Sequence, residues 1–128
     1  MISAKEVQQL HQILIDKFGG RPGIRDIGAL ESALSRPFQT FDNKELYPSA
    51  IEKAASLIES ILTNHPFIDG NKRTGYTVLR LYLLQNSLDI TASSDNRYEF
   101  VINIASGTLQ YERIVDWLKS NTKRRNGR

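Results

Sequence analysis

One short segment, residues 65–75, carries most of the chemistry that this sequence offers; it reads His-Pro-Phe-Ile-Asp-Gly-Asn-Lys-Arg-Thr-Gly. Its histidine can accept a proton near neutral pH, and its aspartate can bind a hard cation such as Mg²⁺. Its adjacent lysine and arginine attract anions. These residue types together indicate chemistry on a phosphate.

The same segment is expected to begin in a turn and to end in a helix. A residue before proline disfavours the helical conformation, so Pro66 should push His65 toward an extended backbone. Asp69-Gly70 indicates a turn. The apolar run at residues 78–84 (VLRLYLL) indicates a buried helix that begins near Asn71.

Lys72 and Arg73 fall at the start of this expected helix. Adjacent cations are usually solvated, but at a helix N-terminus they oppose the helix dipole, which costs stability unless an anion is bound. Free backbone amides at the same place also favour an anion. The segment therefore predicts a bound phosphate with His65 as a general base beside it.

Several polar and aromatic residues also have a structural interpretation. His65 could satisfy a backbone carbonyl, although the convergence of reactive residues around it favours catalysis. Asp69 could cap the following helix, and Asn71 could be a turn residue. Phe67 is predicted to anchor the loop in the core. His11, beside an apolar stripe, is predicted to be a packing histidine rather than a ligand.

Periodicity and capping signals predict an all-α helical bundle with little or no sheet. Helices are expected from the capping box Ser3/Glu6 through Val7, Leu10, Leu14 and Phe18; from Asp26 to Leu34; from the capping box Ser49/Glu52 to Asn64; from Asn71 to a break at Asn86-Ser87; from a cap at Asp95 to Ile104, closed by Gly107; and from about Leu109 to Ser120. Residues 38–48 should form an irregular connection.

The run His65-Pro66-Phe67-x-Asp69-Gly70-Asn71-Lys72-Arg73 resembles the signature of the Fic/Doc superfamily, most closely that of its death-on-curing (Doc) branch, the toxins of bacterial toxin–antitoxin pairs. The resemblance continues in residues 19–26 (GGRPGIRD), 30–37 (LESALSRP) and 46–48 (LYP). It implies a compact bundle with a signature loop followed by a helix. We call residues 65–75 the signature segment.

The resemblance also implies a role for each residue of the signature. His65 would take the proton from a hydroxyl of a target protein, and Asp69 would hold Mg²⁺. Phosphates of ATP would be bound by Gly70, Asn71, Lys72 and Arg73 together with the amides of the helix start.

Two positions separate this chain from the AMP-transferring Fic proteins. Those proteins carry Gly where Lys72 stands and a second Arg where Tyr76 stands, whereas Doc-type proteins share the Lys. The resemblance then implies that ATP binds in the reverse sense and presents its γ-phosphate to a Thr or Ser hydroxyl of a translation factor, with elongation factor Tu as the expected target. The alternatives are AMP transfer on the same scaffold and a non-catalytic module that binds an anion or nucleic acid.

Control by a separate protein is expected. Many Fic proteins carry an inhibitory helix of the form Ser/Thr-x-x-x-Glu-Gly/Asn, but here only Thr108 and Glu112 have the spacing, and Arg113 follows them. The Doc resemblance implies a small antitoxin whose disordered tail folds into a groove near the signature. Residues 38–47 could form a flap that docks the target through backbone hydrogen bonds.

Composition limits the remaining possibilities. The length of 128 residues suits one domain, expected at residues 1–121, and the absence of cysteine fits the reducing bacterial cytoplasm. No signal peptide or membrane span is visible. The net charge is +3, less than the four cations Lys123, Arg124, Arg125 and Arg128 contribute alone. The basicity therefore belongs to residues 122–128, expected to be a disordered tail, which argues against a nucleic-acid-binding face on the fold.

Overall fold

The computed structural model describes residues 2–125, and helices dominate them. The α-helices in this range are α1 (Ala4–Phe18), α2 (Ile27–Ser35), α3 (Ala50–Asn64), α4 (Asn71–Gln85), α5 (Ser94–Ala105) and α6 (Tyr111–Ser120), with a short 3-10 turn η1 (Arg36–Phe38) after α2. The strands are β1 (Thr40–Phe41), β2 (Lys44–Glu45), β3 (Leu88–Ile90) and β4 (Thr122–Arg124). The predicted all-α bundle is confirmed, with two short two-stranded antiparallel sheets added to it.

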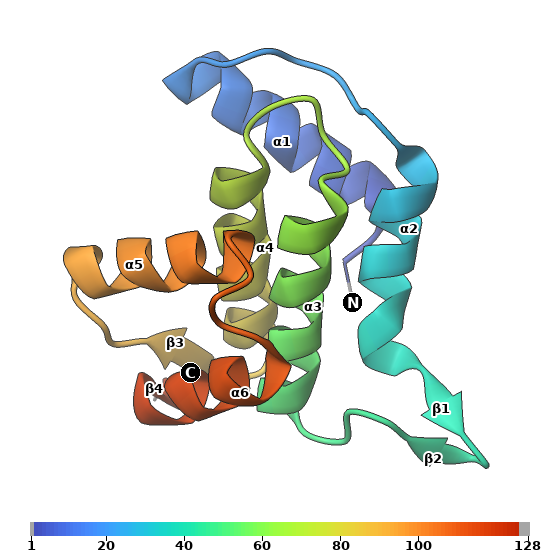
Figure 1. The fold of residues 1–128 in the computed structure, drawn as a ribbon, viewed down its shortest axis with the longest axis vertical. Helices are drawn as coiled ribbons and strands as arrows, with labels where there is room; N and C mark the ends of the chain where they lie inside the picture. Colours follow the sequence, from blue (N-terminus) through green and yellow to red (C-terminus); the bar gives the residue numbers. More distant parts are fainter. Residues whose placement is uncertain (1, 126–128) are drawn as a thin grey trace.

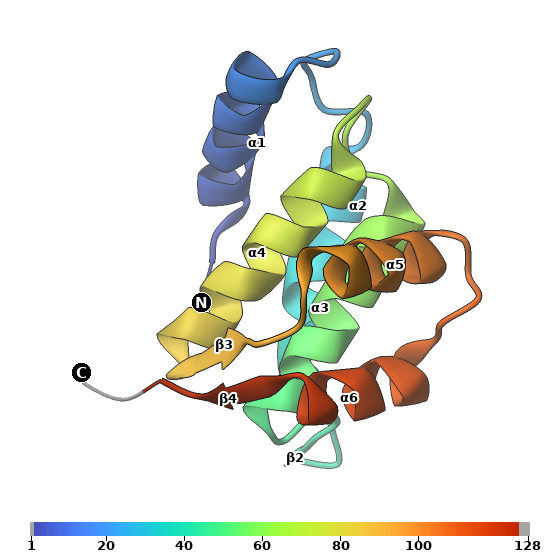
Figure 2. The same cartoon turned by 90° about the vertical axis from the view of Figure 1, so that its left-hand side faces the viewer.

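Helix α3 lies at the centre, beside α4, with α2, α5 and α6 around the pair and α1 across one end (Figures 1 and 2). Its central position explains its composition. Nearly every residue from Lys53 to Leu62 is buried, and small side chains such as Ala54, Ala55 and Ser56 allow neighbouring helices to approach closely. The helix that leads into the signature segment is thus held on all sides.

Capping side chains set where most of the helices begin. Ser3 and Glu6 form a complete capping box at α1, and Ser49 and Glu52 form another at α3, as predicted. The predicted cap at Asp95 is wrong. The hydroxyl of Ser93 accepts from the Asn96 amide at 3.2 Å and caps α5, which leaves Asp95 in the first turn, where its charge still suits the helix dipole.

The buried side of α1 differs from the predicted stripe. Val7, His11 and Ile15 are buried in an i, i+4, i+8 line, while Phe18 is 53% exposed. Phe18 is not a core residue, because its ring lies under the guanidinium of Arg73, 4.3 Å from the ring centroid.

Part of the predicted disordered tail is an ordered strand. β4 pairs antiparallel with β3, with Leu88 opposite Arg124 and Ile90 opposite Thr122. The Arg125 amide also donates to the Ser87 carbonyl at 2.8 Å. Backbone pairing to β3 therefore keeps residues 122–125 on the fold, and a domain boundary at 121 cuts through this sheet; residues 126–128 lie outside the described residues.

The connection at residues 38–48 contains an ordered hairpin. Thr40 pairs with Glu45 and Phe41 with Lys44, and both turn residues, Asp42 and Asn43, have positive φ. The hairpin projects at the end of the molecule opposite the α3–α4 loop (Figures 1 and 2). α3 separates the two and spans about 22 Å. The segment predicted as a flap is therefore an ordered hairpin, and its docking of a target stays a prediction.

Among residues 2–125, no helix combines the length and the apolar character needed to cross a membrane.

Candidate active site

The signature segment begins with a sharp exit from α3. His65 is the C-cap residue and has a left-handed backbone, with φ 48° and ψ 60°, while its amide still donates to the Ile61 carbonyl at 3.2 Å. The expectation of an extended backbone at His65 is therefore wrong, although Pro66 does end the helix. A left-handed conformation is uncommon for a residue other than glycine and needs support from its surroundings.

That support comes from the loop between α1 and α2. The amides of Arg25 and Asp26 both donate to the Pro66 carbonyl, at 2.7 and 3.1 Å, and Ile24 bridges to Phe67. The guanidinium of Arg25 donates to the carbonyls of His65, at 2.6 Å, and Asn64. Residues 19–26 thus strap the loop that carries His65. Sequence reasoning noted these residues but missed this role, because the partners lie 39 and 40 positions apart along the chain.

The two histidines have opposite environments. His11 is 3% exposed, stacks on the Phe67 ring with centroids 3.9 Å apart, and its Nε2 is 2.8 Å from the Asp69 carbonyl oxygen. It is a packing histidine, as predicted. His65 is exposed, and its imidazole has no hydrogen bond within residues 2–125. The ring of His65 is therefore available to accept a proton.

Asn71 and Phe67 fix the middle of the loop. The Asn71 side chain accepts from the Phe67 amide at 3.0 Å and donates to the Phe67 carbonyl at 2.9 Å. Phe67 is 2% exposed, which confirms its predicted role as core anchor. Because both polar ends of the Asn71 side chain are used in this way, its geometry supports the loop; a phosphate contact by Asn71 stays a prediction.

Helix α4 begins at Asn71 without a side-chain cap. Its N-cap is Gly70, with φ 77°. A side chain at Gly70 would face strain from this left-handed backbone and a tight contact with Ile15 at 3.3 Å. The first amides of α4 thus keep no side-chain acceptor, which is the arrangement that binds anions.

Asp69 is not the cap of α4, so that alternative is wrong. Its carboxylate accepts from the Arg21 amide at 3.0 Å and from the Gly70 amide at 2.8 Å. These two backbone hydrogen bonds lower the pKa of Asp69 below its ordinary value. The group is exposed and ionised at neutral pH, and it ties the 19–26 loop to the signature segment.

Asp69 fits the chemistry of a magnesium site in one respect. Mg²⁺ commonly binds one or two protein carboxylates and completes its shell with phosphate oxygens and water. The ionised carboxylate of Asp69, beside the first turn of α4, offers one such ligand. The described residues hold no group of three or more His, Cys, Asp or Glu side chains that could form an all-protein metal site.

A pocket of about 400 Å³ lies along the first two turns of α4. It is lined by the signature residues Asp69, Gly70, Asn71, Lys72 and Arg73, by Tyr76 and Thr77, and by Arg97, Tyr98, Val101 and Ile102 of α5. Five of the seven predicted site residues thus line it, whereas His65 and Phe67 do not. Sequence reasoning missed the contribution of α5, since no pattern in residues 94–105 links them to the signature.

Lys72 and Arg73 form no ion pair with any acidic residue in the described part of the chain. Ion pairs among the described residues join Arg36 to Glu59, Lys53 to Glu45 and Arg80 to Asp89, and none of them involves Lys72 or Arg73. Both side chains are exposed. With the uncapped amides of α4, they form an electropositive surface at one end of the pocket.

Comparison with known proteins places this site in a known family. The Fic/DOC family matches residues 1–83. The chain belongs to this family, in its death-on-curing branch. Two characterised relatives carry the similarity further. "Toxin Doc" of Mycolicibacterium smegmatis is 38% identical over 87 residues, 67% of each chain. "Protein kinase doc" of Escherichia phage P1 is 27% identical over 118 residues, 92% of each chain.

Proposed function

We propose that this protein is a Doc-type toxin that acts as a protein kinase. ATP is the phosphate donor with Mg²⁺, and the acceptor is a Thr or Ser hydroxyl of a translation factor, with elongation factor Tu as the expected target. A small antitoxin protein restrains it in the bacterial cytoplasm. The proposal is supported by the names of the two relatives and by the pocket at the start of α4.

The residues of the chain divide the reaction between them. His65, exposed and without another hydrogen bond in the described residues, accepts the proton of the target hydroxyl. Lys72, Arg73 and the free amides of α4 bind the transferring phosphoryl group and stabilise the charge that develops on it. Asp69 holds Mg²⁺, which neutralises part of the phosphate charge.

Lys72 is the observation that favours phosphoryl transfer over AMP transfer. It stands in the first turn of α4, lines the pocket and has no acidic partner in the described residues. A lysine here fills space and adds a charge, whereas a glycine would leave room for the inner phosphate of a nucleotide over the helix start.

Intact-mass measurement of purified elongation factor Tu after incubation with the protein, ATP and Mg²⁺ tests the proposal. The expected product carries one phosphate, and label from the γ-phosphate of ATP should appear on it. A product that carries AMP, with label from the α-phosphate, would contradict the proposed reaction. An unmodified target would require a search of bacterial proteins for the substrate by the same label.

Two variants at one position separate the charge of Lys72 from its volume. Lys72→Met keeps the volume and should lose transfer, because a charge-assisted phosphate contact is gone. Lys72→Gly should lose phosphoryl transfer as well, and it opens the space that AMP transfer needs. AMP transfer by Lys72→Gly but not by Lys72→Met would assign the choice of reaction to side-chain volume.

A further inference from the structure

His11 is a buried polar side chain that the proposed reaction does not use. It lies in the middle of the buried line Val7, His11 and Ile15 of α1 and is 3% exposed. Its ring stacks on Phe67 with an interplanar angle of 7°, but an apolar side chain could fill this space without the cost of burying a polar group. Packing therefore explains the position of the ring and leaves its polarity unexplained.

The hydrogen bond of His11 accounts for that polarity. The Nε2 atom lies 2.8 Å from the carbonyl oxygen of Asp69, where the loop between α3 and α4 lies against α1 (Figure 1). A carbonyl oxygen can only accept, so Nε2 carries a proton and donates the hydrogen bond. The contact joins residues 58 positions apart and reaches the signature segment from the core.

The peptide group between Asp69 and Gly70 transmits this contact to the Asp69 carboxylate. Because a peptide group is planar and trans, its carbonyl and its amide point in opposite directions. His11 holds the carbonyl, and the Gly70 amide on the other side donates to Oδ1 of Asp69 at 2.8 Å. A contact that fixes the oxygen toward the core thus also fixes the amide that holds the carboxylate.

The other carboxylate oxygen is held from the turn that follows α1. Oδ2 of Asp69 accepts from the Arg21 amide at 3.0 Å. Gly20 approaches so closely that an added Cβ would lie 3.0 Å from Oδ2. Each oxygen of the carboxylate therefore accepts from one backbone amide, and α1 with its following turn supplies or supports both amides.

We infer that His11 is a positioning residue: its hydrogen bond sets the orientation of the Asp69–Gly70 peptide and thereby directs the Asp69 carboxylate to the pocket at the start of α4. The inference rests on the proposed function only for the role of this carboxylate in binding Mg²⁺. The orientation of the peptide does not depend on the reaction, so it can be tested in the protein without nucleotide or metal.

Amide hydrogen exchange, measured by NMR on the protein without ligand, tests the inference at two atoms. His11→Phe keeps an aromatic ring on Phe67 but removes the donor. The Gly70 and Arg21 amides should then exchange about fivefold faster, the factor that corresponds to the loss of one ordinary hydrogen bond. His11→Gln keeps an N–H donor, so both amides should exchange more slowly in it than in His11→Phe. Val7→Ala, one turn earlier on the same buried line, is the matched control; it should lower overall stability and leave both amides within about twofold of the wild type.

A second measurement tests whether this positioning affects metal binding. Calorimetry gives the dissociation constant of ATP without and with Mg²⁺, and the ratio of the two constants reports how strongly the metal links ATP to the protein. His11→Phe should lower this ratio about tenfold, the usual effect of losing a group that orients a metal ligand. A loss of stability alone would change both constants by the same factor and leave the ratio unchanged.

The outcomes separate this inference from the proposed function. If His11→Phe accelerates exchange at both amides but Mg²⁺ does not affect ATP binding by the wild type, the positioning role stands and the metal role in the kinase proposal fails. If both amides exchange within about twofold of the wild type in His11→Phe, while the wild type phosphorylates a target, the inference is wrong and the kinase proposal stands.

Two further results would also overturn the role of His11. One is exchange in a folded His11→Gln that is as fast as in His11→Phe, since the donor would then have no effect. The other comes from the wild type and decides the matter even if His11→Phe does not fold. Nε2 of His11 must carry a proton in ¹⁵N spectra, and an unprotonated Nε2 would contradict the hydrogen bond to Asp69.

Discussion

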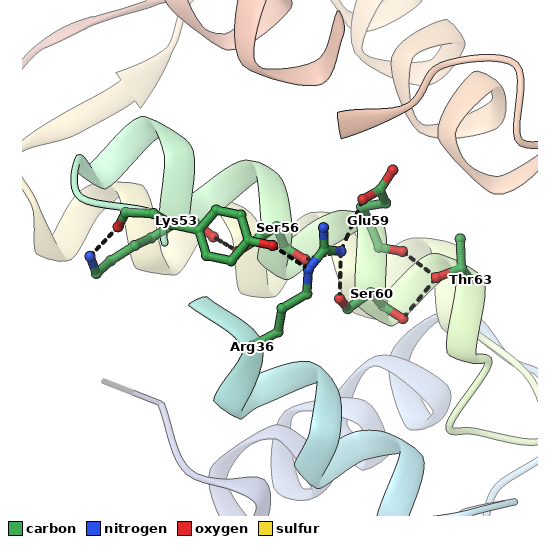
Figure 3. Close-up of polar contacts among 7 residues, drawn as sticks. Arg36, Lys53, Ser56, Glu59, Ser60 and Thr63 are labelled. Atoms are coloured by element: carbon green, nitrogen blue, oxygen red, sulfur yellow. Dashed lines mark hydrogen bonds and ion pairs between the residues drawn. The ribbon is translucent and has the colours of Figure 1, made fainter. Parts of the chain in front are cut away.

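Two clusters of cations in this molecule use the same residue types in opposite ways. At the signature segment, Lys72 and Arg73 are exposed and lack acidic partners among the described residues. Around the middle of α3, the guanidinium of Arg36 donates to Glu59 at 2.9 Å, to the Ser60 hydroxyl at 3.0 Å and to the Tyr47 hydroxyl at 3.0 Å (Figure 3).

The buried amine of Lys53 completes the second cluster. It pairs with Glu45 of the hairpin at 2.6 Å and donates to the Tyr47 carbonyl. These contacts join η1 and the hairpin to α3, so the cations of this cluster are satisfied within the protein. The comparison indicates that paired cations maintain the fold, whereas the unpaired ones at α4 are available to a ligand.

We expect the largest effect from a substitution in the signature segment, His65→Ala. Loss of a general base should lower the transfer rate by about 10²- to 10⁴-fold. Because the imidazole makes no hydrogen bond in the described residues, the thermal midpoint should stay unchanged. Single-turnover transfer and circular dichroism measure the two effects. Full growth arrest by the variant at equal expression would contradict the role of His65.

Variants of Asp69 test whether one residue of the signature segment both binds Mg²⁺ and stabilises the fold. Asp69→Asn keeps acceptor oxygen for the Arg21 amide but removes the charge that Mg²⁺ needs, so the Mg²⁺ concentration for half-maximal transfer should rise about tenfold or more. Asp69→Ala should add a loss of thermal stability to the same defect. If both variants keep the wild-type Mg²⁺ dependence, Asp69 is not the metal ligand.

The pKa of Asp69 gives this prediction a pH range. Hydrogen bonds from Arg21 and Gly70 lower its pKa in the folded protein, so their contribution to stability is complete above the ordinary carboxyl pKa. That contribution is lost only as the pH falls through the lowered value. Asp69 therefore stays ionised from neutral pH down to about pH 5, and no change of Mg²⁺ dependence in that range should arise from it.

Substitutions in the cluster around Arg36 and Lys53 should have the opposite effect: they should lower the free energy of unfolding and leave ligand binding unchanged. Arg36→Met removes the hydrogen bonds to Glu59, Ser60 and Tyr47 and leaves a half-buried carboxylate without its partner. We expect a loss of about 1 to 3 kcal/mol in the free energy of unfolding. Urea denaturation measures it, and ATP affinity at a temperature where the variant is folded should equal that of the wild type. A large loss of ATP affinity with unchanged stability would contradict the conclusion that the paired cations maintain the fold.

The smallest effect is expected from the basic residues at the C-terminus. Replacing Lys123, Arg124 and Arg125 together by Gln keeps the backbone of β4, which a deletion from residue 122 would remove together with its pairing to β3. The side chains are exposed, so stability should change by no more than about 0.5 kcal/mol and the proposed kinase activity should be retained. A large loss of salt-sensitive binding to DNA or RNA in this variant would instead favour a nucleic-acid-binding function.

Local signals allowed much of the fold to be predicted from sequence. Capping boxes such as Ser3/Glu6 act within one turn, and the break at Asn86-Ser87 is equally local, so pattern reasoning found them. The pairing of β4 with β3 was missed because it joins residues more than thirty positions apart, as Leu88 opposite Arg124 shows. No short-range pattern contains such information.

The candidate site shows the same division. The residues with chemical potential lie in one segment, so they could be identified from the sequence. The anchoring role of Phe67 could be predicted in the same way. What holds and completes the site comes from elsewhere, through the Arg25 guanidinium on the His65 carbonyl and the α5 wall at Arg97. The left-handed backbone of His65 also depends on these distant contacts, which is why the local effect of Pro66 predicted it wrongly.

The uncapped start of α4 links ligand binding to the folding equilibrium. With Gly70 in place of a capping side chain, α4 loses a few tenths of a kcal/mol, and an anion that accepts from the same amides would restore it. A ligand present at 100 times its dissociation constant raises the free energy of unfolding by about 2.7 kcal/mol. The melting temperature of this protein should therefore increase with the fraction of protein that has ligand bound. In a cell, a high concentration of the ligand would lower the fraction of this protein that is unfolded.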